Sequence, residues 1–389
     1  LKQVVTPALL AESTPNSGQY WGKFISFTDS RQKTAISAKR FNIGIEREYA
    51  MASILKRLSK DRAMRGGIVP MPLQDIRGIV ASRDIFEHIT RDKNNPHVWA
   101  SYQAAVLRQA VGRRLIHGAG SLEAMGIVTM SYPTINGYPI SQTLKNWSIA
   151  NNAGFTADVW HDFLKICLDF CVRMGNCIQP LDRINYEFEK DYIRDNKPTL
   201  INNPDNGKGK GWPSVTLDKR GKAEEVQDRI ILLLCAALGI NSSADLDITA
   251  NKDLVNGILQ DAWDQLTDAT TGVLTMDSTG GYYLDLSADD PYSRKAMISL
   301  NKTVSVCPVT KSFVDVTFRG YSPLMKGRLN RANLDMYICT QTERIPLLPG
   351  PGTTEIEDWL ESDPDVQKLK DDGFWSNYME NVYLGKDVY

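Results

Sequence analysis

The sequence predicts a mixed α+β fold that is mostly helical. Long stretches carry apolar residues at helical spacing, as in Phe155 to Met174, whereas strand signals such as Gly126 to Met130 are short. Of the 389 residues, 42% are hydrophobic and 23% are charged, which is ordinary for a globular protein with a sizeable core. The longest apolar runs are far shorter than the roughly 20 residues of a membrane span, so we expect a cytoplasmic protein.

The first predicted element is a short apolar strand, Phe24 to Phe27, which ends in a polar turn. Helix-capping residues in this turn open a basic helix that is predicted to extend from about Arg31 to Leu58. The free amides and positive dipole end of such a helix favour an anion, although an ordinary capped helix beside a sheet has the same pattern. One interpretation is a phosphate contact made by Thr28, Asp29, Ser30, Arg31, Gln32 and Lys33.

Charge is unevenly distributed along the chain, although the net charge is only −1. Residues 31–65 hold ten Lys or Arg against three acidic residues, a net of +7, and residues 353–389 hold ten acidic residues against three Lys, a net of −7. The basic end is suited to a phosphate backbone, which the acidic end would repel. The alternative is two solvated helix faces, which would pair with each other.

In the middle of the chain, the helix from Phe155 to Met174 places large apolar residues and two cysteines on one side, which indicates a core helix. The six cysteines form no CxxC pair and no Cys/His cluster, so we expect buried free thiols. Asn202 to Gly211 is rich in Asn and Gly and is predicted to be a linker without regular structure. The histidines lie in no nucleophile or metal-ligand pattern, so no catalytic or metal-binding residue is predicted.

The second half opens with two predicted helices, Ala223 to Leu238 and Asp253 to Leu266, which lead into a hairpin from Val273 to Leu286. Two helices and a hairpin are the layout of a winged-helix module. The second helix has no Lys or Arg after Lys252, so we expect a structural module rather than one that enters a DNA groove.

Two strands, Thr303 to Val306 and Phe313 to Phe318, are predicted next. A basic stretch follows them close to an aromatic residue. Arginine and aromatic side chains together suit single-stranded nucleic acid, in which bases stack and phosphates pair with cations, whereas the alternative is a plain surface loop. The candidate nucleic-acid-binding residues here are Arg319, Tyr321 and Arg328.

The sequence FTDSRQ at Phe27 to Gln32, followed by Thr34 and Ala35, resembles motif IV in the second RecA-like lobe of superfamily 2 helicases. More precisely, it is similar to the large DEAD/DEAH-type helicases of bacterial phage-defence systems, of the Druantia and DISARM kinds, which carry a long insertion after this motif. Further segments resemble the same helicases in the same order: Ser121 to Val128 with Tyr132-Pro133, Phe163 to Phe170 with Val172-Arg173, Gly281 to Leu286, Cys307 to Thr310, Asp315 to Tyr321, and Trp359 to Pro364.

The resemblance implies a segment of an ATP-dependent DNA helicase or translocase that acts against foreign DNA. No GxxxxGK[ST] loop and no DExH or DExD tetrad is present, and Gln109 to Arg114 matches only the opening of helicase motif VI. We therefore expect no cofactor in this chain. ATP and magnesium would bind the parent helicase, and this chain would be a piece of it. The implied partners are DNA, the remaining helicase lobes and other defence-system subunits.

In this interpretation the chain begins with a linker and the start of the RecA-like lobe, and the long insertion follows. The alternative is a non-catalytic scaffold or adaptor that binds a protein partner, which the missing ATP motifs and the acidic tail favour. The predicted divisions are 1–65 for the linker and lobe, 66–201 for a helical insertion, 202–212 for a linker, 213–300 for the winged-helix-like module, 301–345 for a small β-containing module, and 346–389 for an acidic helical tail.

Overall fold

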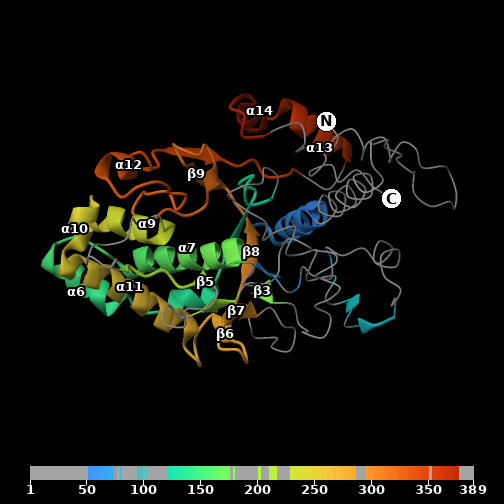
Figure 1. Cartoon of the computed structure of the whole chain (residues 1–389). Helices are drawn as coiled ribbons and strands as arrows, with labels where there is room; N and C mark the ends of the chain where they lie inside the picture. The colour runs from blue at the N-terminus through green and yellow to red at the C-terminus, as the bar shows by residue number, and fades with distance from the viewer. Residues whose placement is uncertain are drawn as a thin grey trace, which may run out of the picture. The chain divides into compact units, whose positions relative to one another are not determined.

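The computed structural model describes residues 51–73, 121–175, 178–179, 200–202, 210–216, 228–285, 295–349 and 353–375, with a few positions between 74 and 102. The fold is mixed α+β, as the sequence predicts, and Figure 1 shows helices beside small sheets. No helix among the described residues is long and apolar enough to cross a membrane. The chain forms two compact units. Unit 1 is Leu1–Val69, Asp75–Val111 and Pro346–Tyr389, and unit 2 is Pro70–Gln74 and Gly112–Ile345.

The helical part of unit 2 is built on α6 (Gln142–Ala150), α7 (Ala157–Gly175), α9 (Arg229–Leu238) and α11 (Thr249–Thr267), which Figure 1 shows grouped together. In α7, Trp160, Phe163, Leu164 and Cys167 are fully buried, which confirms the predicted core helix. The predicted buried thiols are confirmed for Cys167, Cys171 and Cys235, which are free and buried.

Side-chain caps set the helix starts. The Asp228 carboxylate accepts hydrogen bonds from the amides of Ile230 (2.9 Å) and Ile231 (3.3 Å), so the described helix α9 begins at Arg229 and not at the predicted Ala223. It ends at Gly239, whose φ of 75° is the left-handed conformation that glycine adopts without strain. A short helix, α10 (Ser243–Asp247), leads from there to α11, which begins before and extends beyond the predicted Asp253 to Leu266.

Two antiparallel sheets connect distant parts of unit 2. In the first, β8 (Met297–Leu300) lies between β1 (Met71–Pro72) and β2 (Val128–Ser131), with Val128 opposite Leu300. In the second, β9 (Thr303–Val306) lies between β10 (Phe313–Val314) and β11 (Gln341–Arg344). The strand predicted to reach Phe318 ends at Val314, where the pairing with β9 stops. From there the chain is held by the Asp315 side chain, which bonds to Thr129 and Lys165 on other elements.

The third sheet contains β3 (Ile178–Gln179), β7 (Tyr282–Asp285), β4 (Ile201–Asn202) and β5 (Lys210–Gly211) in that order. Strand β6 (Leu274–Met276) pairs with β7, which confirms the predicted hairpin. The predicted linker is wrong at its ends, because β4 and β5 pair in parallel. The physical reason is Trp212, which is 3% exposed and donates its indole N–H to the Leu259 carbonyl (2.8 Å), so it fixes the chain next to β5.

In unit 1, residues 51–65 are helical and the helix stops at Gly66, whose φ is 71°. The predicted end at Leu58 is therefore wrong. Leu58 is itself buried, and Arg57 forms an ion pair with Asp61 one helical turn later, at 3.1 Å between Nε and Oδ2. These contacts stabilise the helix past Leu58.

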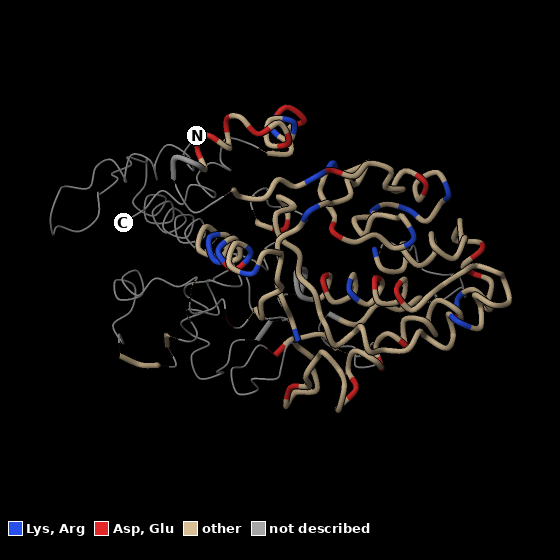
Figure 2. The backbone as a smooth tube through the Cα atoms, turned by 180° about the vertical axis from the view of Figure 1, so that it is seen from behind, with Lys and Arg blue, Asp and Glu red and all other residues tan. Residues whose placement is uncertain are grey.

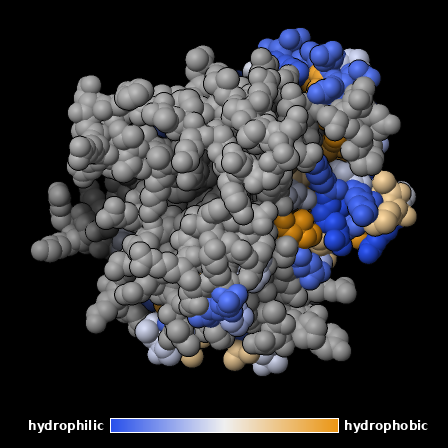
Figure 3. Space-filling view, turned by 90° about the vertical axis from the view of Figure 1, so that its right-hand side faces the viewer, coloured by the Kyte–Doolittle hydropathy of each residue, from blue (hydrophilic) through white to orange (hydrophobic). Residues whose placement is uncertain are grey.

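Within the predicted helical tail, the structure has helices α13 (Thr353–Ser362) and α14 (Pro364–Asp371), and the Asp363 carboxylate caps α14. The end of the predicted tail, residues 376–389, lies outside the described residues. On the face drawn in Figure 3, hydrophilic colouring predominates among the described residues and hydrophobic colouring is confined to small patches.

Candidate nucleic-acid interface

Of the predicted contact residues, Arg319, Tyr321 and Arg328 are described, and the structure places the first two in one tight turn. The backbone amide of Phe318 donates to the carbonyl of Tyr321, and the amide of Tyr321 donates to the carbonyl of Phe318, both at 3.0 Å. The other predicted residues, Thr28, Asp29, Ser30, Arg31, Gln32 and Lys33, lie outside the described residues.

The turn has an arginine at a position with a positive φ angle, where glycine or asparagine is usual. Arg319 has a φ of 51° and Gly320 a φ of 83°, the positive pair of a two-residue type I′ hairpin turn. Glycine adopts this conformation freely, but for a side chain such as that of Arg319 it costs roughly 1–2 kcal/mol. Such strain persists only where the surroundings hold it, and it is concentrated at functional sites.

Two contacts from the loop between α6 and α7 hold the Arg319 side chain. Its guanidinium donates to the carbonyl of Ala153 (2.6 Å) and lies over the ring of Phe155, with 4.5 Å between Cζ and the ring centroid. Arg319 remains exposed to solvent. The guanidinium therefore has a fixed position and retains surface for an anion or a stacked base.

Phe155 belongs to a column of aromatic rings that extends into the core. Its centroid lies 5.9 Å from those of Trp147 and Phe318, and Phe318 lies 5.0 Å from Phe163, which stacks on Trp160 at 5.5 Å. Phe163, Phe318 and Trp160 are fully buried. The support under Arg319 is therefore rigid, which lowers the entropic cost of binding a ligand there.

Three segments meet at one end of the β10-β9-β11 sheet, and we call them the loop-end surface: 307–312, 318–322 and 336–341. Val306 pairs with both Phe313 and Gln341, so the first and third segments leave the sheet side by side. The amide of Cys339 donates to the carbonyl of Gly320 (2.8 Å), which attaches the Arg319 turn to them. None of these segments contains Asp or Glu, and their exposed side chains include Val309, Lys311, Arg319, Met336 and Ile338.

Arg328 lies in a neighbouring loop that is organised by side-chain amides. The Asn333 amide donates to the carbonyls of Lys326 (2.9 Å) and Arg328 (3.0 Å), and the amide of Lys326 donates to the Tyr337 hydroxyl (3.2 Å). Burial raises the pKa of the Tyr337 hydroxyl, against the opposing effect of its hydrogen bond with the Lys326 backbone. Lys326 and Arg328 are exposed, and Figure 2 shows the blue Lys and Arg positions spread along the tube of unit 2.

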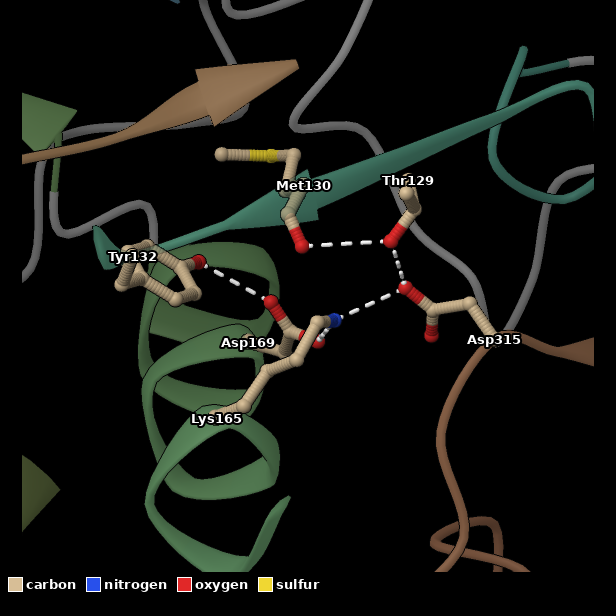
Figure 4. A network of polar contacts seen from close by, with 6 residues as sticks. All are labelled: Thr129, Met130, Tyr132, Lys165, Asp169 and Asp315. Carbon is tan, nitrogen blue, oxygen red and sulfur yellow. Dashed lines mark hydrogen bonds and ion pairs between the residues drawn. The ribbon is translucent and has the colours of Figure 1, made fainter. Parts of the chain in front are cut away.

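A cluster of charged and hydroxyl side chains joins α7 and β2 to the segment after β10, and the sequence did not predict it. Lys165 donates to Asp169 on its own helix (2.7 Å) and to Asp315 (2.8 Å), the Thr129 hydroxyl donates to Asp315, and the Tyr132 hydroxyl donates to Asp169 (2.9 Å). Figure 4 shows Lys165 reaching between the two carboxylates. The available signal was a Lys and an Asp four residues apart in an apolar helix.

The cluster is largely withdrawn from water. The side chains of Lys165, Asp169 and Asp315 are 14%, 5% and 15% exposed. Nearby, burial raises the pKa of Asp162 above its usual range against the opposing effect of Lys165, while Asp158 and Asp315 add to the increase. Among the described residues, no group of three or more His, Cys, Asp and Glu is placed to hold a metal ion. The chemistry that the cluster shows is that of ion pairs and hydrogen bonds.

Comparisons of the chain with protein-family models, with curated proteins and with solved structures return no match.

Proposed function

We propose that this chain is a segment of an ATP-dependent DNA helicase or translocase that acts in defence against foreign DNA. In this proposal the chain supplies nucleic-acid contacts and accessory structure, including a winged-helix-like module, and residues 1–65 contain the start of a RecA-like lobe. ATP and magnesium bind the parent enzyme, whose remaining lobes and fellow defence subunits are the protein partners, in the cytoplasm. The ordered segments that resemble the phage-defence helicases support this assignment.

The observation that carries the nucleic-acid role is the fixed, exposed guanidinium of Arg319 on the acid-free loop-end surface. A guanidinium binds phosphate oxygens through two parallel N–H groups, and one held in place loses little rotamer freedom on binding. Lys311 adds a second cation on the same surface. Both charges favour a polyanion.

The apolar side chains around Arg319 favour unpaired nucleotides over duplex. Val309 is 42% exposed and Ile338 is 39% exposed, and the half-buried Tyr321 forms a β-bridge with Ile338. Duplex DNA presents phosphates and groove edges, whereas a single strand also presents base faces that stack on planar or apolar groups. The guanidinium of Arg319 lies over Phe155 and is exposed to solvent, and a guanidinium plane is a surface on which an unpaired base can stack.

The test is fluorescence anisotropy of labelled single-stranded and duplex DNA with the full chain over a salt series. We expect Arg319→Ala to weaken single-strand binding and to reduce the slope of log affinity against log salt by about 1, because one phosphate contact is lost. The matched control is Lys302→Ala, which removes the same charge from an exposed residue at the opposite end of β9. Equal effects of the two substitutions would show that only net charge matters.

A separate double variant tests the predicted contact residues that lie outside the described part of the chain. Arg31→Ala with Lys33→Ala tests the helix start that resembles helicase motif IV, and a drop in affinity would assign it to the DNA track. Undiminished binding by this pair together with a loss in Arg319→Ala would place the contacts of this chain on the loop-end surface.

A second candidate function is a scaffold or adaptor that binds a protein partner. The observation in its favour is Met336, which is 54% exposed close to Ile338 on the loop-end surface. Exposed apolar side chains that cluster are typical of protein interfaces. Failure to bind either form of DNA at low salt, together with capture of another subunit that Met336→Ser abolishes, would favour this function.

A further inference from the structure

We propose that Lys165 and Asp315 are positioning residues that hold the Arg319 turn in its binding geometry. This inference depends on the proposed nucleic-acid contact at Arg319. Neither residue reaches the loop-end surface itself, and both act through the chain segment that joins β10 to the turn.

The link between the cluster and the turn is short. Asp315 follows directly after Val314, the last residue of β10, and stands four residues before Arg319. Its carboxylate receives the Lys165 ammonium at 2.8 Å and the Thr129 hydroxyl through the same oxygen, Oδ2 (Figure 4). Helix α7 and strand β2 therefore both fix the point at which the chain leaves the sheet.

Lys165 is itself fixed from the other side. Asp169 lies one helical turn further along α7 and accepts hydrogen bonds from both Lys165 (2.7 Å) and the Tyr132 hydroxyl (2.9 Å). The ammonium thus has a defined position before it meets Asp315. Phe163, two residues earlier on α7, packs on Phe318 at 5.0 Å, so the same helix holds both ends of segment 315–318.

This arrangement limits the movement of the Arg319 turn. The turn is held beyond residue 318 by the Ala153 carbonyl and by Cys339, and before it by the Asp315 anchor. A binding contact needs its groups held to within about 0.5 Å. The bonds to Ala153 and Cys339 act on residues 319 and 320, so the segment that leads into the turn depends on the Asp315 anchor as well. Loss of the anchor releases the turn into positions in which Arg319 no longer rests on Phe155.

The decisive variant is Asp315→Asn, because positioning and simple electrostatics predict opposite signs. Removal of a negative charge near a phosphate-binding surface strengthens attraction for DNA if only charge matters. If Asp315 positions the turn, single-strand binding weakens on the order of tenfold, as for coupled neighbouring residues. The matched control is Asp335→Asn in the same part of the chain, where Asp335 is exposed and pairs with Arg331 at 3.4 Å, and we expect unchanged or slightly tighter binding.

A double variant separates positioning from general damage. In the Arg319→Ala background, Asp315→Asn has no turn contact left to disturb, so we expect no further loss of affinity. Additive losses would mean that Asp315 acts on binding by another route and would overturn the proposal, as would tighter binding by Asp315→Asn alone. If Asp315→Asn does not fold, Thr129→Val removes one of the two groups on the same carboxylate oxygen and keeps the ion pair, and we expect a smaller loss of the same sign.

The outcomes also separate this inference from the function on which it rests. Unchanged binding by Arg319→Ala would reject the contact at the turn. A loss in Arg319→Ala without a loss in Asp315→Asn or Thr129→Val would leave that contact in place and reject only the positioning role.

Discussion

Gly126 is the position where a single added methyl group should damage the fold most clearly. Its φ is 73°, and a Cβ at this residue would lie 2.9 Å from Cδ2 of Phe313 and 3.0 Å from Cδ1 of Ile345. Phe313 and Ile345 are each 2% exposed, so neither can turn into solvent. We expect Gly126→Ala to lower the free energy of unfolding by about 2–4 kcal/mol, from left-handed backbone strain and overpacking together.

Two other glycines separate these contributions. Gly239 has a φ of 75° and open space around the added Cβ, so Gly239→Ala measures the backbone cost alone, about 1 kcal/mol. Gly137 has open space and no positive φ, so Gly137→Ala should change stability by about 0.5 kcal/mol or less. Urea unfolding followed by tryptophan fluorescence gives the midpoints, provided that the m-values agree. If Gly126→Ala matched Gly239→Ala, the crowding against Phe313 would be refuted.

Three smaller predictions follow from single groups. Asp228→Ala should cost about 1 kcal/mol because two amides at the start of α9 lose their cap, and urea unfolding should show Asp228→Asn close to the parent protein. Burial raises the pKa of Tyr138 to about 12, whereas the phenol of an unfolded chain has its ordinary pKa of about 10, so stability should fall as the pH rises between these values. Tyr138→Phe should remove that dependence in unfolding curves measured at several alkaline pH values. Burial also raises the thiol pKa values of Cys167 and Cys235, so peptide mapping should find them alkylated only after denaturation, and rapid labelling of the native chain would contradict their burial.

The elements that the sequence predicted well are those whose pattern is local. Helix α7 repeats apolar residues at helical spacing over its length, and the turn of the β6-β7 hairpin contains Gly280 and Gly281. The errors arise where contacts with residues distant in sequence determine where an element begins or ends. Strand β10 stops at Val314, and the next residue, Asp315, is held by Thr129 and Lys165, which are distant in sequence. Strand β5 forms beside a tryptophan that is anchored on α11.

The candidate site shows the same contrast between local patterns, which the sequence reveals, and distant contacts, which it does not. Arg319 and Tyr321 were identified from their composition alone, a basic and aromatic stretch after a strand. The residues that hold Arg319 could not be predicted in this way. Phe155 and Ala153 are more than 160 residues away from it in sequence, and the helical pattern of α7 does not indicate which loop covers that helix. Periodicity predicts which face of an element is buried, but it carries no information about the partner.

The buried cluster also gives a physical reason for segments far apart in the chain to be held together. Tyr132, Asp169 and Asp315 belong to three segments that are distant in sequence, and Lys165 or its partner Asp169 connects them all. Removal of one member of a buried ion pair costs roughly 3–5 kcal/mol, because the charge left behind has lost its compensation. Substitution of Lys165, Asp169 or Asp315 should therefore weaken the packing of all three segments together, whatever the surface above them binds.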